Sequence, residues 1–107
     1  SFRASVTCVR VPVYRAHSIA ISAEFQQPVD LQRAQDILSR APGLDVVDDP
    51  QQNQYPLPLL ASGRDHCQVG RLRVDCALDN GLCFWVAGDQ LLKGAALNAV
   101  QIAELLV

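Results

Sequence analysis

The chain has 107 residues, of which 50% are hydrophobic and 19% are charged, so it can build one hydrophobic core but not a two-domain enzyme. Its net charge is −2 and its basic residues are scattered, which argues against nucleic acid or membrane as partners. It has no apolar run near the ~20 residues that cross a bilayer and no N-terminal signal pattern, so we expect a cytoplasmic protein. Because it begins at Ser1 and contains no methionine, we expect a fragment or a processed chain.

Two strands are predicted near the N-terminus. Residues 4–13 are rich in β-branched side chains, and valine occupies every second position at the end of this stretch, which is typical of a strand. This strand should end near Pro12. Over residues 17–25, large apolar side chains alternate with small or polar ones, which predicts a second, half-exposed strand.

A helix is predicted over residues 31–41. Asp30 is a good N-cap, apolar residues recur at spacings of three and four, and the Pro-Gly pair at 42–43 ends the pattern. A short strand over residues 44–47 should follow. Residues 48–63 contain three prolines and many polar side chains, which favours a long irregular loop of the kind that often serves a function.

The C-terminal half predicts a hairpin and a final helix. Strands over 67–74 and 82–87 flank an Asp-Asn-Gly sequence at 79–81 that tolerates a tight turn. The segment 91–107 is apolar around most of its circumference, so we expect a helix with protein on nearly all sides. The order of elements predicts an α+β fold, with a mixed or mainly antiparallel sheet covered by helices.

The four cysteines do not predict a metal site. Their spacing contains no CxxC pair, and both histidines are distant in sequence. Two of them lie in apolar stretches and are best interpreted as small hydrophobic residues in strands of a reduced protein. The four are Cys8, Cys67, Cys76 and Cys83, of which Cys8 and Cys83 have the apolar neighbours.

The most chemically suggestive pair is Arg10 and His17. The turn region between them would allow both to lie on one rim of a sheet. Arginine presents a planar fork of donors suited to a carboxylate or phosphate, and histidine exchanges protons near neutral pH. The alternative is a surface charge and a structural imidazole at a strand end, and the pair by itself does not decide between these interpretations.

A resemblance to a known family adds to this interpretation. Residues 7–13, Thr-Cys-Val-Arg-Val-Pro-Val, and 16–18, Ala-His-Ser, resemble the Arg-Val-Pro…His segment of aspartate-semialdehyde dehydrogenases. Further similar segments follow in the family's order and extend over essentially the whole chain. They are Pro-Gly-Leu at 42–44, Tyr-Pro-Leu-Pro at 55–58, Val-Gly-Arg-Leu-Arg at 69–73, and Gly-Asp-Gln-Leu-Leu-Lys-Gly-Ala-Ala-Leu-Asn-Ala at 88–99.

The resemblance implies roles for three residues. Arg10 would bind the substrate carboxylate, His17 would be the catalytic acid/base for a cysteine located upstream of Ser1, and Gln90 would contact the nicotinamide end of NADP. For Gln90 the alternative is a solvated residue at the first turn of the last helix, with Asp89 as the N-cap. No metal ligand is expected.

Three hypotheses follow for the function. The leading one is that residues 1–107 are the C-terminal part of the catalytic and dimerisation domain of an NADP-dependent aspartate-semialdehyde dehydrogenase in amino-acid biosynthesis. Its partners would be aspartate semialdehyde, phosphate and a second subunit, helix 91–107 would pack on a nucleotide-binding domain outside the chain, and the chain alone would be inactive. The others are a non-catalytic relative that acts as a dimerising or binding protein, and a free-standing small binding module.

Overall fold

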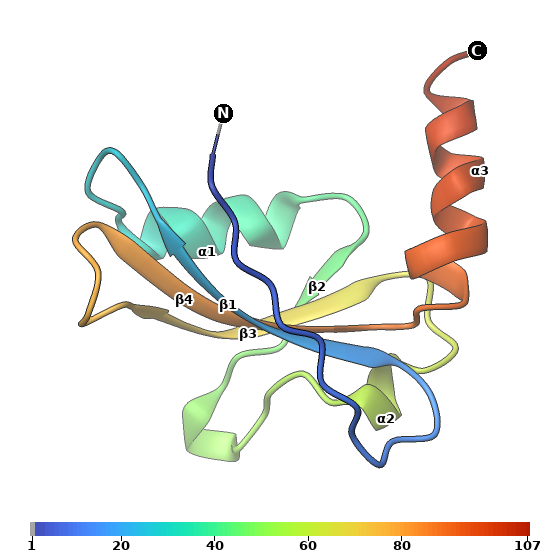
Figure 1. Ribbon diagram of the computed structural model, residues 1–107, viewed down its shortest axis with the longest axis horizontal. Coiled ribbons are helices and arrows are strands. Elements are labelled where there is room, and N and C mark those ends of the chain that lie inside the picture. Colours follow the sequence, from blue (N-terminus) through green and yellow to red (C-terminus); the bar gives the residue numbers. More distant parts are fainter. Residues whose placement is uncertain (1) are drawn as a thin grey trace.

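The computed structural model describes residues 2–107 and has a single four-stranded sheet with helices on its faces and at one end (Figure 1). The strand order is β1-β4-β3-β2, in which β4 pairs antiparallel with β1 and β3, and β2 pairs parallel with β3. The predicted α+β fold with a mixed sheet is therefore confirmed. The elements are β1 (His17–Glu24), α1 (Leu31–Arg40), β2 (Leu44–Val46), the 3-10 helix η1 (Pro50–Gln52), α2 (Pro58–Ala61), β3 (Cys67–Val74), β4 (Gly81–Gly88), the π-helix η2 (Leu92–Ala96) and α3 (Leu97–Glu104).

The strand predicted over residues 4–13 is wrong. Residues 2–16 contain no strand and run as an extended, largely exposed segment, with Val9 73% exposed. A strand needs a neighbouring edge for its hydrogen bonds as well as alternating side chains. Within residues 2–107 this segment has the side-chain pattern of a strand but pairs with neither edge of the sheet.

The two faces of the sheet are covered by different segments. Helix α1 lies over one face, and the segment that contains η1 and α2 lies over the other (Figure 1). Asp30 caps α1 as predicted, because its Oδ1 accepts a hydrogen bond of 2.7 Å from the Arg33 backbone N–H. The helix ends at Arg40, one residue before the predicted end. The capping carboxylate and the apolar stripe thus locate α1 correctly.

The proline-rich segment is more regular than predicted. Prolines at the first turns of η1 and α2 are compatible with helix, since the first helical N–H groups have no intrahelical partner. Two of the hydrogen bonds that hold the segment on the sheet are those in which the Leu57 N–H donates to Gln68 Oε1 at 3.3 Å and Trp85 Nε1 donates to the Pro56 carbonyl at 3.2 Å. It forms a cover for the sheet.

The hairpin of β3 and β4 contains a bulge between Gly70 and Arg73. Arg71 has a φ of 55°, and the backbone N–H groups of Arg71 and Leu72 donate to the carboxylate of Asp48, each at 2.9 Å. Amides that lose their ladder partner at a bulge need another acceptor. Asp48 supplies it, and a feature of this kind has no signature in the alternation of side chains.

The single helix predicted over residues 91–107 is only partly correct. The segment begins as the π-helix η2, in which the Gly94 N–H donates to the Asp89 carbonyl and the Ala96 N–H donates to the Leu91 carbonyl, and it continues as α3. Helix α3 rises away from the end of the sheet (Figure 1). Its apolar side chains Val100 and Ile102 are exposed, so the protein expected around this helix does not come from residues 2–107.

Candidate active site

His17 is the first residue of β1. It pairs with Gly88, the last residue of β4, and its side chain is exposed and makes no hydrogen bond or ion pair with any of residues 2–107. The residue before it, Ala16, is buried and has a φ of 74°. This left-handed conformation is unfavourable for a residue with a Cβ, and backbone strain of this kind is concentrated at functional sites.

Gln90 follows strand β4 at the end of the sheet where β1 begins. It is two positions beyond Gly88, the residue that pairs with His17. Its side chain is half-buried, and its Oε1 is enclosed without a hydrogen-bond partner among the described residues. A buried amide oxygen with no donor is uncommon in a folded protein. Gln90 therefore has an acceptor that no donor among residues 2–107 satisfies.

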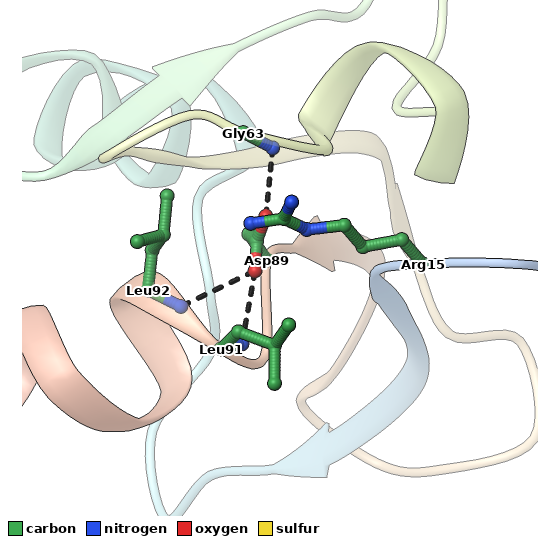
Figure 2. A network of polar contacts seen from close by, with 5 residues as sticks. All are labelled: Arg15, Gly63, Asp89, Leu91 and Leu92. Carbon is green, nitrogen blue, oxygen red and sulfur yellow. Dashed lines mark hydrogen bonds and ion pairs between the residues drawn. The ribbon is translucent and has the colours of Figure 1, made fainter.

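A polar network centred on Asp89, the residue directly before Gln90, includes Arg15, which is two positions before His17 (Figure 2). The Asp89 side chain is fully buried. Its Oδ2 accepts from the Gly63 N–H at 2.7 Å and lies 2.7 Å from Arg15 Nε, and its Oδ1 accepts from the N–H groups of Leu91 and Leu92 at 2.9 and 3.2 Å. Both carboxylate oxygens thus have donors. The N-cap position of η2 is Leu91 rather than Asp89 as predicted, but Asp89 still accepts the N–H groups where the helical segment begins.

The pKa of Asp89 is lowered from 3.8 to about 2. The hydrogen bond from Gly63 is the main cause, burial acts in the opposite direction, and the hydrogen bonds from Leu91, Leu92 and Arg15 add to the lowering. Hydrogen bonds to an ionised carboxylate favour the charged form. Asp89 is thus an anion at neutral pH, held among three segments of the chain.

Arg10 is exposed on the extended N-terminal segment, and it makes no side-chain hydrogen bond or ion pair with any of residues 2–107. The structure brings His17 and Gln90 to the same end of the sheet and leaves Arg10 without a contact to either. The guanidinium of Arg10 is available to a ligand or to another part of the protein.

Sequence reasoning missed Arg15 and Gly63 as parts of this site. Arg15 is two positions before His17, and Asp89 directly precedes Gln90, so both ends of the ion pair adjoin the predicted site residues. That adjacency was an available signal. The pairing itself joins segments far apart in the sequence, which local patterns do not report.

A second polar cluster lies away from this end of the sheet. The Ser22 hydroxyl and the Cys83 thiol, the latter at 3.0 Å, both donate to Asp75 Oδ2. The Ser22 hydrogen bond is the main cause of a pKa of about 2 for Asp75, and the Cys83 hydrogen bond adds to it. The thiol of Cys83 is half-buried as expected of a strand residue, whereas Cys8 is exposed and outside any strand, contrary to the prediction.

A shallow groove of about 410 Å³ lies beside this cluster, on the face covered by the proline-rich segment. Three aromatic side chains, those of Tyr55, Phe84 and Trp85, and the two arginines Arg71 and Arg73 contribute to its lining. Among residues 2–107, no group of three or more His, Cys, Asp or Glu residues is placed to hold a metal ion. No helix in this part of the chain is long and apolar enough to cross a membrane.

Comparison with known proteins agrees with these observations. Residues 1–93 match the family model described as semialdehyde dehydrogenase, dimerisation domain. The chain is 50% identical over 107 residues to the aspartate-semialdehyde dehydrogenase of Aquifex aeolicus, covering 100% of this chain and 32% of that protein. It is 53% identical over 105 residues to the enzyme of the same name from Synechocystis, covering 98% of this chain and 31% of that protein.

Solved structures give the same result for the fold. The aspartate semialdehyde dehydrogenase II of Vibrio cholerae superposes with a TM-score of 0.81 at 38% identity, covering 90% of this chain and 28% of that one. A probable aspartate-semialdehyde dehydrogenase from Pseudomonas aeruginosa gives 0.78 at 33% identity, covering 89% and 28%. The chain spans about a third of the length of the relatives that it matches. It belongs to the semialdehyde dehydrogenase family and corresponds to the C-terminal dimerisation domain of aspartate-semialdehyde dehydrogenase.

Proposed function

We propose that this chain is the C-terminal part of an NADP-dependent enzyme that interconverts aspartate semialdehyde plus phosphate with aspartyl phosphate in amino-acid biosynthesis. The observation that carries the proposal is identity of 50% and 53% to two aspartate-semialdehyde dehydrogenases over essentially the whole chain. The placement of His17 and Gln90 at one end of the sheet supports it. The protein would act in the cytoplasm as a homodimer.

In this proposal His17 is the acid/base of the reaction. The oxidation of an aldehyde through a cysteine requires a group that removes the thiol proton and manages protons on the substrate oxygen. An exposed imidazole with no internal hydrogen bond is free to do this. The cysteine would come from a part of the enzyme outside this chain, because none of the four cysteines here lies in an Asn-Cys-Thr sequence like that of the family's nucleophile.

Arg10 is the substrate-positioning residue in this proposal. A guanidinium binds a carboxylate through two parallel charge-assisted hydrogen bonds and thereby fixes its orientation as well as its charge. The absence of any partner for Arg10 among residues 2–107 supports a role toward a ligand. Arg10 would discriminate against aldehydes that lack the carboxylate.

Gln90 is the cofactor contact in this proposal. When bound, NADP supplies the hydride acceptor. The enclosed, unpartnered Oε1 of Gln90 fits an amide N–H donor such as the carboxamide of a nicotinamide ring. The chain contributes this contact and not the phosphate-binding part of the site, since it has no glycine-rich loop after a strand.

The last helix is proposed to pack on the nucleotide-binding domain. Val100 and Ile102 of α3 are each more than half exposed, and apolar side chains on one short helix gain free energy only when another surface covers them. A contact with that domain would bring the nicotinamide site and Gln90 together. On its own, the chain would then be inactive.

The test is an activity assay on the full-length protein that contains this chain. Purified protein is incubated with aspartate semialdehyde, phosphate and NADP, and NADPH formation is followed with phosphate omitted as the control. We expect phosphate-dependent NADPH formation. A folded homodimer that forms no NADPH from NADP, and no NADH when NAD is supplied instead, would contradict the proposal and select the non-catalytic dimerising relative.

A further inference from the structure

The Arg15–Asp89 ion pair connects the two ends of the chain that carry the proposed site. Arg15 Nε lies 2.7 Å from Asp89 Oδ2 (Figure 2). Arg15 is two positions before His17, and Asp89 is one position before Gln90. A displacement of either partner is therefore passed on to one of the two site residues through no more than one intervening residue.

The carboxylate of Asp89 is built into its position and does not adjust freely. It is fully buried, and it also receives the N–H groups of Gly63, Leu91 and Leu92. Gly63 presents its N–H from a φ of 76°, a conformation that glycine adopts readily. Asp89 is thus a fixed anion, and Arg15 is the partner whose side chain remains partly exposed, at 42%.

The backbone between Arg15 and His17 is strained. Ala16 has a φ of 74° and is 4% exposed, and such a conformation persists only where the surroundings hold it. On one side of Ala16 the strand pair of His17 with Gly88 holds the chain. On the other side, the ion pair of Arg15 holds it. Loss of the ion pair would leave Ala16 fixed at one side only.

We propose that Arg15 and Asp89 are positioning residues of this site, which hold the His17 imidazole and the Gln90 amide in one arrangement relative to each other. The inference rests on the proposed function. Neither residue touches the reacting atoms. Arg15 acts through Ala16 on His17, and Asp89 acts through the start of the last helix on Gln90.

The test uses the full-length enzyme with Arg15→Met, Arg15→Lys and Asp89→Asn. A shift of about 1 Å in a reacting group can lower a rate by about 10²-fold, so we expect kcat of Arg15→Met to fall by that order and KM for NADP to rise. KM for aspartate semialdehyde should change little, because Arg10 is untouched. Arg15→Lys should restore part of kcat, since it keeps the charge but not the planar fork.

Two controls separate positioning from general stability. Arg64 is an exposed arginine whose Nε donates to the Leu60 carbonyl at 3.1 Å, so Arg64→Met makes the same substitution and removes an arginine hydrogen bond without touching β1. It should leave kcat unchanged. In the His17→Asn background, Arg15→Met should cause no further loss of kcat but should still raise KM for NADP.

The outcomes distinguish the two proposals. Unchanged kcat and unchanged KM for NADP in both Arg15→Met and Asp89→Asn, in an enzyme whose His17→Asn variant is impaired, would overturn the positioning role and leave the proposed function standing. The positioning role would also be overturned if Arg15→Met lowered kcat by the same factor in the His17→Asn background as in the wild type. It would be overturned as well if Arg64→Met lowered kcat as much as Arg15→Met does. An inactive wild-type enzyme would refute the proposed function and the catalytic meaning of the ion pair together.

Discussion

His17 pairs directly with Gly88 across the β1–β4 ladder. Gly88 is in turn flanked on its other side by Cys67 of β3, because a Cβ built on Gly88 would lie 2.7 Å from Cys67 Sγ. The three residues form a row across the end of the sheet. The proposed acid/base is therefore separated from the half-buried thiol of Cys67 by a residue without a side chain.

Substitution of His17 by asparagine should impair chemistry rather than binding. General acid/base catalysis contributes roughly 10²- to 10⁴-fold to a rate, so we expect kcat of the full-length enzyme to fall by that order, with KM for aspartate semialdehyde nearly unchanged. Steady-state kinetics measure both. His66→Asn is the matched control, since His66 is paired with Asp45 at 2.9 Å on the surface, and turnover that falls equally in both variants would refute the role of His17.

Substitution of Arg10 should impair binding of the substrate. Hydrogen bonds to charged groups are worth about 1.5–3 kcal/mol, which corresponds to a rise in KM for aspartate semialdehyde of roughly 10- to 100-fold in Arg10→Ala, with KM for NADP unaffected. Arg33→Ala, which removes an exposed arginine side chain of α1, provides the comparison. A normal KM in Arg10→Ala would show that another residue binds the carboxylate.

The row at the end of the sheet predicts a rescue. In Gly88→Ala the new methyl group would clash with the Cys67 sulfur, and overpacking of this kind costs about 1–3 kcal/mol. Removal of the sulfur in Cys67→Ala leaves the Cβ of residue 67 at 3.6 Å, which is ordinary contact. Urea unfolding should show that the double variant is no less stable than Cys67→Ala alone. Additive losses would show that Gly88 is required for a different reason.

Gly70→Ala should be destabilising without a comparable rescue. A Cβ at this position would lie 2.1 Å from the Val47 carbonyl oxygen and 2.8 Å from Pro56 Cδ, so backbone has to move. We expect a loss of about 3 kcal/mol, at the upper end of the range for overpacking, measured by urea unfolding. Ala substitution at Gly94, where an added Cβ would make only contacts of 3.6 Å, should cost clearly less.

The lowered pKa of Asp89 predicts a specific dependence of stability on pH. Its pKa is about 2 in the folded protein against 3.8 as a reference, so its contribution is complete above about pH 3.8 and is lost as the pH falls through that interval toward 2. The difference in Tm between wild type and Asp89→Asn should therefore be constant near neutral pH and shrink below about pH 4. A difference that grows on acidification would contradict the assignment.

Much of the sheet could be predicted because its pattern is local. Residues 67–74 were predicted with the observed bounds, and the ends of α1 followed from Asp30 and the Pro-Gly pair at 42–43. The first strand was wrong because alternation reports which side chains could share a face, not whether the backbone forms a ladder, and residues 2–16 form none. The π-helical start of the last helix was missed because the segment is apolar around most of its circumference, so the rotation that a π turn introduces displaces no distinct apolar stripe.

The residues of the candidate site also fall into two groups, those that local sequence predicts and those that depend on a tertiary contact. His17 and Gln90 were proposed from short segments that resemble a family, and Asp89 was noted as a candidate N-cap from its residue type. Arg15 was overlooked although it lies two positions from His17, because its importance depends on a contact with Asp89 that forms only when both ends of the sheet are in place. Local sequence identifies the groups and tertiary structure identifies which of them are connected.

The extended N-terminal segment has a consequence for handling the protein. It carries alternating, exposed valines, and β1 beside it is an edge strand with unpaired backbone groups. Both are templates for strand addition from another molecule. A preparation limited to these residues would thus have two places for self-association by strand addition, the N-terminal segment and the edge of β1. Edge-to-edge growth has no fixed end point, so the number of subunits as a function of concentration distinguishes it from a closed pair.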